Sequence, residues 1–184
     1  MRVVVFAGYS GAGKTPLIDA LIPWLKGRGL RVSVVKHAHH GFDIDHPGKD
    51  SYRHRAAGAF EVVVASARRL ALMREFEHEL PYEAPLTVHQ LIAELDGGVD
   101  WVLVEGFRHA DLPKIEIWRA GQDRPPLYPG DPRVAALVTA DAPPQATALP
   151  VFAPDAVAAL GAWLLAHSAR FDYDAARYLP DCHA

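Results

Sequence analysis

The chain has 184 residues, half of them hydrophobic and 22% charged with both signs mixed. This composition supplies enough apolar material for the core of one globular domain and excludes a disordered chain. The formal net charge of -3 provides no general basic surface, so we expect no nucleic-acid partner, and any anion must bind at a local site. Cys182 is the one cysteine; this excludes a disulfide within the chain and a thiolate zinc site, and it suits a reducing cytoplasm.

Residues 2–7 form an unbroken apolar run with β-branched side chains, which predicts a strand buried on both faces. The run is too short for a signal-peptide core or a membrane span, so we expect no membrane association. A Gly-rich turn follows, and Pro16 then suits the first turn of a helix. Apolar residues recur in that helix at 3.6-residue spacing: Leu17, Ile18, Leu21, Ile22 and Leu25.

The rest of the chain alternates strands and helices. Further strands are predicted at residues 32–35, 61–65, 70–73, 101–104 and 134–138, with an alternating strand around Ile115 and Ile117. Helices are predicted at residues 50–59, 85–95 and 155–167. Because most of these strands are uniformly apolar, the pattern predicts an α/β fold with a mostly parallel sheet flanked by helices.

Residues 8–15 read Gly-Tyr-Ser-Gly-Ala-Gly-Lys-Thr and match the phosphate-binding loop pattern G-x-x-x-x-G-K-[ST], between an apolar strand and an amphipathic helix. The glycines let the backbone wrap around a phosphate, and the helix N-terminus adds partial positive charge there. Lys14 is expected to neutralise the β- and γ-phosphate oxygens as a catalytic residue, and the Thr15 hydroxyl to coordinate Mg²⁺. An ordinary Gly-rich turn is the alternative, but pattern and context together favour the P-loop. The expected nucleotide contacts are Ser10, Gly11, Ala12, Gly13, Lys14, Thr15 and Pro16.

Acidic residues elsewhere are candidates for the metal site and the reaction. Glu105 follows the strand at residues 101–104, where a Walker-B acid stands in P-loop proteins. It is a candidate to hold the Mg²⁺ shell or to position an attacking water, with a solvated strand-end glutamate as the alternative. Asp43 and Asp45 follow the second strand in a loop. Asp45 is a candidate metal ligand, and an ordinary turn is the alternative.

Histidines and arginines give weaker signals. His37, His39, His40 and His46 crowd one loop with the aspartates. Histidine and carboxylate can bind a transition metal, but the spacing matches no metal motif, and a polar loop near phosphates explains these residues equally well. Arginines suited to contact a phosphate or a second substrate are spread along the chain, and each alone is more simply a solvated surface residue: Arg53, Arg55, Arg68, Arg69, Arg108 and Arg119.

Several segments carry a resemblance to a known family in their order and spacing. They are residues 8–15, Lys36-His37-Ala38-His39-His40, Phe42-Asp43-Ile44-Asp45, Pro47-Gly48-Lys49-Asp50-Ser51, Ala57-Gly58-Ala59, Ala65-Ser66, Arg69-Leu70-Ala71-Leu72-Met73, Val102-Leu103-Val104-Glu105-Gly106-Phe107 and Pro113-Lys114-Ile115-Glu116. Together they resemble MobB, the family of molybdopterin-guanine dinucleotide biosynthesis adapter proteins, over about residues 2–168. The His/Asp segment joined to Pro-Gly-Lys-Asp-Ser is much more specific than the phosphate loop.

The resemblance implies a P-loop NTPase fold and a protein that binds GTP and Mg²⁺, at most with slow Mg²⁺-dependent GTPase activity. It also implies a homodimer that assists the molybdenum cofactor guanylyltransferase, the enzyme that attaches GMP to molybdopterin; molybdopterin itself is a further candidate partner. By the same resemblance the phosphates fall to Gly11, Gly13, Lys14 and Thr15, and Mg²⁺ falls to Thr15 with Asp45 and Glu105 nearby.

Three features depart from the family pattern. Pro16 stands where the family usually has a second hydroxyl residue. Asp141 follows a predicted strand and could accept hydrogen bonds from guanine N1 and N2, but Thr139-Ala140-Asp141 lacks the Asn/Thr-Lys-x-Asp pattern of ordinary GTPases. Residues 169–184 have no counterpart in the resemblance. We therefore expect a nucleotide-binding domain at residues 1–168 and a C-terminal tail of unknown role at residues 169–184.

Two other classes of function stay open from the residues alone. A small-molecule kinase or ATP-dependent ligase would use Asp43 and Asp45 to hold an acceptor hydroxyl, with Arg53 or Arg55 closing over phosphates. A pure binding module would use the nucleotide only to order a dimer or a docking face. The adapter reading agrees with the lack of an arginine at a position dedicated to the terminal phosphate, since such an arginine raises hydrolysis by ~10³–10⁵-fold.

Overall fold

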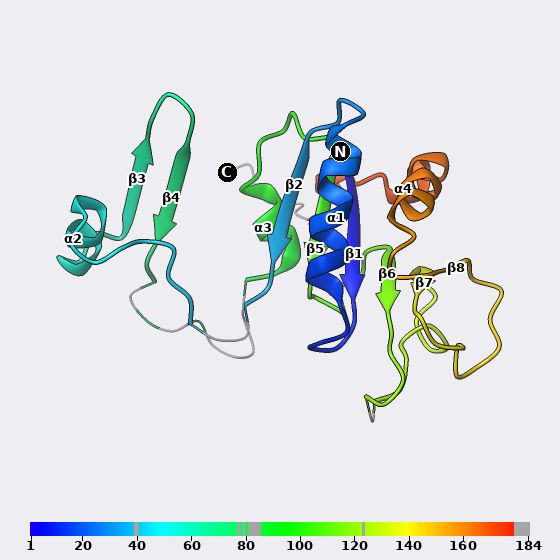
Figure 1. The fold of residues 1–184 in the computed structure, drawn as a ribbon. Helices are drawn as coiled ribbons and strands as arrows, with labels where there is room; N and C mark the ends of the chain where they lie inside the picture. The colour runs from blue at the N-terminus through cyan, green and yellow to red at the C-terminus, as the bar shows by residue number, and fades with distance from the viewer. Residues whose placement is uncertain (39–40, 77, 79, 81–85, 123, 179–184) are drawn as a thin grey trace. The chain divides into compact units, whose positions relative to one another are not determined.

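Figure 1 shows the computed structural model, which describes residues 1–38, 41–76, 78, 80, 86–122 and 124–178. The chain divides into two compact units, one made of Met1–His37 with Thr87–Ala184 and the other of Ala38–Leu86. Each unit is built around its own sheet. Cys182 and the histidines 39 and 40 lie outside the described residues.

The larger unit contains a six-stranded sheet in the order β2-β5-β1-β6-β7-β8. Every neighbouring pair is parallel, so the predicted parallel α/β fold is confirmed. The strands are β1 (Arg2–Ala7), β2 (Val32–Lys36), β5 (Trp101–Glu105), β6 (Lys114–Ile117), β7 (Val134–Val138) and β8 (Val151–Phe152).

Side chains of β1 alternate between two hydrophobic cores, one on each face of the sheet. Val4 and Phe6 contribute to the core under α1 (Lys14–Lys26) and α4 (Val157–Ala166). Val3 and Val5 contribute to the core under α3 (Val88–Ala93). Both faces are therefore covered by helices, which explains why the central strands are uniformly apolar.

Local signals explain where two of these helices begin. Gly13 adopts a left-handed backbone (φ 105°) directly before α1, a conformation that glycine adopts without steric cost. Thr87 caps α3 in a capping box: its side chain accepts from the Gln90 amide, and the Gln90 side chain accepts from the Thr87 amide. The described part of this helix is shorter than the predicted range 85–95, whose first residue lies outside the described residues.

The strand β6 differs from its predicted alternating pattern. All four residues of Lys114–Ile117 are buried, including the charged Lys114 and Glu116. The alternation in the sequence therefore does not mark a solvent face; the two charged side chains are buried beside internal partners.

The smaller unit holds α2 (Asp50–Ala56) and an antiparallel pair, β3 (Glu61–Ala65) and β4 (Leu70–Arg74). The sequence pattern predicted both strands, but they form this separate sheet and not part of the parallel one. The four residues 66–69 that join them suffice for a hairpin, whereas a parallel connection needs a crossover of about a dozen residues. Ser66 makes the turn, because its hydroxyl accepts from the amides of Arg68 and Arg69.

The described part of the C-terminal segment packs against the rest of the larger unit. It contains two short 3₁₀ helices, η1 (Ser168–Phe171) and η2 (Ala175–Arg177). Phe171 is 1% exposed, and its ring lies 5.6 Å from that of Trp101. Tyr173 N–H donates to Met1 C=O over 3.1 Å. Within the described parts of the chain, no helix combines the length and apolar character that crossing a membrane requires.

Candidate functional site

The loop between β1 and α1 has the backbone geometry that its glycines predict. Gly8 has φ 153°, and a Cβ atom built there would lie 2.4 Å from the carbonyl oxygen of Ile117. Gly11 and Gly13 both have left-handed φ values. The ammonium group of Lys14 folds back over the loop and donates to the carbonyls of Gly8 (3.0 Å) and Tyr9 (2.8 Å). The loop therefore binds the ammonium group of Lys14 through its own backbone carbonyls.

Three side chains from three different elements converge beside this loop. The Thr15 hydroxyl at the start of α1 donates to Glu105 Oε1 at the end of β5 over 2.7 Å. Lys36 Nζ, at the end of β2, lies 3.3 Å from the same oxygen. Parallel strands bring their carboxyl ends to one edge of the sheet, which is why residues so far apart in sequence meet here. Among the predicted site residues, Thr15 and Glu105 are thus brought together.

Burial and neighbouring charges change the pKa of Lys14 at this edge. Loss of hydration lowers the pKa of Lys14, opposed by the nearby carboxylate of Glu105 and reinforced by the positive charge of Lys36. The glutamate side chain is 12% exposed. A phosphate chain placed here would meet two ammonium groups and partly replace the hydration that Lys14 has lost.

The turn after β5 is shaped by a close approach to β2. Gly106 has φ 94°, and a Cβ atom there would lie 3.0 Å from the Cβ of His37. His37 N–H donates to the Glu105 carbonyl over 3.0 Å, and its ring lies 4.8 Å from the ring of Phe107. These contacts fix the backbone on both sides of Glu105, so its carboxylate is held in a defined position.

The loop after β6 is anchored by the two buried charges of that strand. The Glu116 carboxylate accepts from the amides of Leu127 (2.6 Å) and Tyr128 (2.8 Å). Burial raises the pKa of Glu116 above its ordinary value, against the effect of these two donors. Lys114 Nζ lies 2.9 Å from Asp131 Oδ2. The same loop reaches the phosphate loop, where Gln122 Nε2 donates to the carbonyl of Ser10 over 3.1 Å.

Two arginines lie beside the phosphate loop: Arg108, which the sequence offered among several candidates for a phosphate contact, and Arg124, which it did not. The guanidinium carbons of Arg108 and Arg124 lie 4.6 Å and 5.5 Å from the centre of the Tyr9 ring. Tyr9 occupies one of the variable positions of the motif, so its aromatic character is the one local signal that could have indicated cation–π partners. Lys36 was likewise missed, although its place at a strand end before His37 gave the same kind of signal as Glu105.

Asp141 lies at the turn after β7. Its Oδ2 accepts from the amide of Ala120 over 2.8 Å, and its own amide donates to the Thr139 hydroxyl over 3.0 Å. The residue therefore connects the turn after β6 with the turn after β7. Its contact with guanine stays a prediction. The Ala120 amide bonds to Oδ2, so Oδ1 is the oxygen that would accept from guanine.

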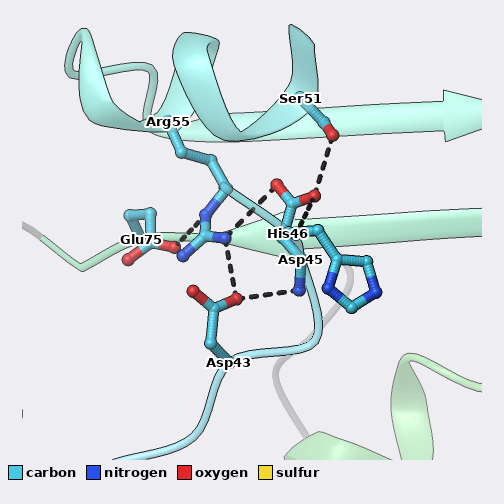
Figure 2. Close-up of polar contacts among 6 residues, drawn as sticks. All are labelled: Asp43, Asp45, His46, Ser51, Arg55 and Glu75. Atoms are coloured by element: carbon cyan, nitrogen blue, oxygen red, sulfur yellow. Dashed lines mark hydrogen bonds and ion pairs between the residues drawn. The ribbon is translucent and has the colours of Figure 1, made fainter. Parts of the chain in front are cut away.

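Asp45 belongs to the smaller unit, whereas Thr15 and Glu105 belong to the larger one. Figure 2 shows its surroundings. Asp45 Oδ1 accepts from the His46 amide and the Ser51 hydroxyl, each over 2.9 Å. Arg55 Nη1 lies 3.4 Å from Asp45 Oδ2 and 3.0 Å from Asp43 Oδ1, and its Nε lies 2.7 Å from Glu75 Oε1.

This cluster holds its aspartates ionised. Loss of hydration works toward a higher pKa at Asp45, but hydrogen bonds from His46, Ser51 and Arg55 outweigh it and hold the pKa below its ordinary value. At Asp43 the Asp45 amide and then the Arg55 guanidinium lower the pKa. The carboxylates in turn raise the pKa of Arg55. Asp43 and Asp45 are therefore already ion-pair partners of Arg55.

Over the residues that the structure describes, no three His, Cys, Asp or Glu side chains are grouped as a metal site would require. A Mg²⁺ site of the P-loop kind does not need such a group, because phosphates and water supply most of its ligands. The Thr15 hydroxyl and the Glu105 carboxylate are oxygen donors of the type that Mg²⁺ prefers. Thr15 and Glu105 therefore have the donor atoms that a Mg²⁺ site at the phosphate loop requires.

Comparisons with known proteins identify the family of this chain. The family model described as molybdopterin guanine dinucleotide synthesis protein B, MobB, matches residues 3–140. The molybdopterin-guanine dinucleotide biosynthesis adapter protein of Escherichia coli (strain K12) is 45% identical over 125 residues, which is 67% of this chain and 69% of that protein. The protein of the same name from Haemophilus influenzae is 42% identical over 119 residues, 64% of each chain.

Solved structures give the same answer for the fold. The crystal structure of a molybdopterin-guanine biosynthesis protein B has a TM-score of 0.67 at 26% identity, covering 89% of this chain and 97% of that one. The MobB homolog from Bacillus stearothermophilus has a TM-score of 0.64 at 24% identity, covering 90% and 97%. Since the family model spans well over half of the residues, this chain belongs to the MobB family.

Proposed function

We propose that this protein is a GTP-binding adapter, with at most slow Mg²⁺-dependent GTPase activity, that assists synthesis of the guanine dinucleotide form of the molybdenum cofactor. The observation that carries the proposal is the convergence of Lys14, Thr15 and Glu105 at the carboxyl edge of the parallel sheet. The adapter role is taken from the names of the relatives in E. coli and H. influenzae. A cytoplasmic location agrees with such a role.

The side chains supply most of what a bound triphosphate needs. Lys14 would transfer its hydrogen bonds from the carbonyls of Gly8 and Tyr9 to phosphate oxygens, while backbone N–H groups of residues 10–15 would donate to the same anion. Mg²⁺, when bound, would neutralise charge on the phosphates. Thr15 would then turn its hydroxyl oxygen to the metal, and Glu105 would hold the metal's water shell or the attacking water.

Asp45 is proposed as a further contributor to the Mg²⁺ shell. To do so it would give up part of its bonding to Arg55, Ser51 or the His46 amide. The kinase or ligase alternative gains little support from this cluster, because Asp43 and Asp45 both accept from Arg55 and would have to give up that bonding to hold an acceptor hydroxyl.

The preference for guanine is proposed to rest on Asp141, whose position between two turns presents one carboxylate oxygen. The test is a calorimetric titration with GTP and with ATP, each with and without Mg²⁺. Preferential, Mg²⁺-dependent binding of GTP that weakens in Asp141→Asn supports the proposal. Equal affinity for GTP and ATP would contradict it and favour the kinase or ligase alternative.

Assembly into a homodimer is proposed from the hairpin of the smaller unit. One face of the β3–β4 pair, which we call the hairpin face, exposes Val63 (57%), Leu70 (70%) and Leu72 (44%). Apolar side chains gathered in this way favour a protein contact. We expect Leu70→Glu with Leu72→Glu to convert dimer to monomer in sedimentation equilibrium, while Val151→Glu, an equally apolar exposed residue of the larger unit, leaves the dimer intact.

The partner in the proposal is the molybdenum cofactor guanylyltransferase, with molybdopterin as a further candidate ligand. The direct test is capture of purified guanylyltransferase by immobilised protein, with GTP and Mg²⁺ present or absent. Binding that requires GTP would assign the nucleotide a role in docking. Binding with no dependence on nucleotide would assign the P-loop a role after docking.

A further inference from the structure

A cavity of about 250 Å³ lies at the amino end of the parallel sheet, at the opposite end of β1 from the phosphate loop. Its walls come from Val3 on β1, the residues that precede β6 and β7, and the C-terminal segment. Because Val3 and Gly8 are five residues apart on an extended strand, roughly 16 Å separates the two places. The cavity is therefore distinct from the nucleotide site.

Three arginines line this cavity: Arg133, Arg170 and Arg177. The Arg133 side chain is 51% exposed and lies 3.9 Å from Asp131, at the limit of an ion pair. Arg177 lies over the ring of Tyr178, with its guanidinium carbon 5.5 Å from the ring centre. For Arg170 no ion pair with another residue of the described ranges occurs. Arg170 and Arg177 thus have no carboxylate partner among the described residues, and Arg133 has only a long one.

The two acidic residues of the wall, Asp111 and Asp172, both bond to other side chains. Asp172 Oδ1 lies 3.4 Å from Arg2 Nε, and the two residues also form an antiparallel bridge. Asp111 Oδ1 lies 2.9 Å from His89 Nε2, whose ring also bonds to Tyr173 Oη through Nδ1 over 3.1 Å. Asp131, which Arg133 approaches, is bound more closely by Lys114. The wall therefore carries three arginines against the carboxylates of Asp111 and Asp172, and Asp172 is already paired with Arg2, so a positive excess is left.

The C-terminal segment that closes the cavity is held in place by aromatic stacking. The ring of His89 on α3 lies 4.1 Å from that of Tyr178 at an interplanar angle of 8°, and Tyr173 and Tyr178 stack at 5.3 Å. Phe171 in the same segment is buried in the core. The segment therefore forms an ordered wall of the cavity. It lies beyond residues 3–140, which the family model matches.

We propose that this cavity is a second anion site, which binds the phosphate group of a small phosphorylated metabolite through Arg133, Arg170 and Arg177. Guanidinium groups suit phosphate because their planar donors can bond to two of its oxygens at once. The volume is below the range of about 300–1,000 Å³ typical of sites that enclose a whole drug-sized ligand. A phosphate or diphosphate group therefore fits inside, with the rest of the metabolite outside. This function is added to the nucleotide site and does not depend on it.

The test is calorimetric titration of the full chain with pyrophosphate, compared among four variants. Lys14→Ala removes the phosphate-loop contribution. In that background Arg170→Gln and Arg133→Gln each remove one arginine of the cavity. Arg68→Gln removes an arginine of the smaller unit and is the control, because it changes the net charge by the same amount. Thermal unfolding of each variant checks that the fold is unchanged, as expected for exposed arginines.

The site predicts that Lys14→Ala retains pyrophosphate binding and that adding Arg170→Gln or Arg133→Gln weakens it ~10-fold or more. The control Arg68→Gln should leave the affinity within ~2-fold, since it alters only long-range, screened charge. Loss of all pyrophosphate binding in Lys14→Ala would overturn the proposal. Equal weakening by the control would also overturn the proposal, because the loss of affinity would then reflect the net charge of the protein and not contacts in the cavity.

Discussion

Thr15 Oγ1 donates a hydrogen bond to Glu105 Oε1 over 2.7 Å and so joins the first turn of α1 to the end of β5. The same carboxylate oxygen lies 3.3 Å from Lys36 Nζ. Two of the residues proposed for the Mg²⁺ shell, Thr15 and Glu105, are therefore bonded to each other, with the Lys36 ammonium beside them. Predictions about metal binding follow from this contact.

Replacing Glu105 by glutamine should weaken the Mg²⁺-dependent part of GTP binding ~10-fold or more, because the variant loses the negative charge that faces the metal shell. Binding without Mg²⁺ should change little, since Lys14 and the loop amides carry that part. Calorimetry across a series of Mg²⁺ concentrations measures both quantities. Asp19→Asn, an exposed acid on α1, is the control. A variant with the wild-type dependence on Mg²⁺ would remove Glu105 from the metal site.

Lys14→Met should reduce nucleotide affinity at least ~100-fold, since several charged hydrogen bonds to phosphate are lost together. The same change should raise the melting temperature of the nucleotide-free protein at pH 7. Burial lowers the pKa of Lys14 below 10.5 in the folded state, so keeping the lysine charged costs stability at neutral pH. As pH rises through the folded pKa toward 10.5 that cost disappears, and the two melting temperatures should converge. Scanning calorimetry at several pH values tests this; a variant that melts lower throughout contradicts it.

The sequence predicted the parallel sheet and the phosphate loop well because both depend on local patterns. The strand at residues 2–7 is buried on both faces and so needs a continuous apolar run, and the loop needs glycines at Gly8, Gly11 and Gly13, where φ is positive. Glu105 was expected at the Walker-B position after a core strand, and it reaches Thr15 because the carboxyl ends of parallel strands share an edge. Its role at a metal stays a prediction.

The remaining contacts depend on pairings that sequence spacing does not encode. Lys36 reaches Glu105 only because β2 and β5 are neighbours in the sheet. Arg124 reaches Tyr9 only because Lys114 and Glu116, buried in β6, hold the loop that carries it. The separate hairpin of residues 61–65 and 70–73 was missed because the apolar pattern of its strands resembles that of a buried strand, although one of its faces is exposed.

The Arg55 cluster predicts how the smaller unit responds to acid. Since the pKa values of Asp43 and Asp45 are lowered in the folded state, their contribution to stability is present above the unfolded value of about 3.8. It is lost as pH falls below that value through the folded pKa. NMR titration of the carboxyl carbons should place both folded pKa values below 3.8, and Arg55→Gln should raise them.

The matched control for that experiment is Arg53→Gln. Arg53 lies on the same helix α2 and pairs with Asp50 at 3.5 Å, but both side chains are well exposed. Such a pair contributes little, so the titration of Asp43 and Asp45 should not change in this variant. Equal shifts in the two variants would mean that general charge, and not the Arg55 contacts, sets the pKa values.

Gly8→Ala should disturb the phosphate loop by direct steric conflict. The added methyl would lie 2.4 Å from a backbone oxygen of Ile117, which cannot move away without displacing β6. We expect a loss of ~1–3 kcal/mol in unfolding free energy and a matching loss of nucleotide affinity. Denaturant unfolding measures the first and calorimetry the second. Gly97→Ala, where nothing lies within 4 Å of the added methyl, should be close to wild type in both; no difference between the two alanine variants would contradict the steric argument.

Glu116 should prove to be the anchor of the loop that faces the phosphate loop. Glu116→Ala leaves the amides of Leu127 and Tyr128 without their buried acceptor, which costs ~1–3 kcal/mol for each unsatisfied group. Hydrogen exchange at these two amides should accelerate strongly, whereas amides in β1 should retain their protection. Glu116→Gln keeps the size and one good acceptor oxygen, so its effect should lie between those of wild type and alanine. If exchange at Leu127 and Tyr128 were unchanged in Glu116→Ala, other contacts such as Lys114 with Asp131 would have to hold the loop.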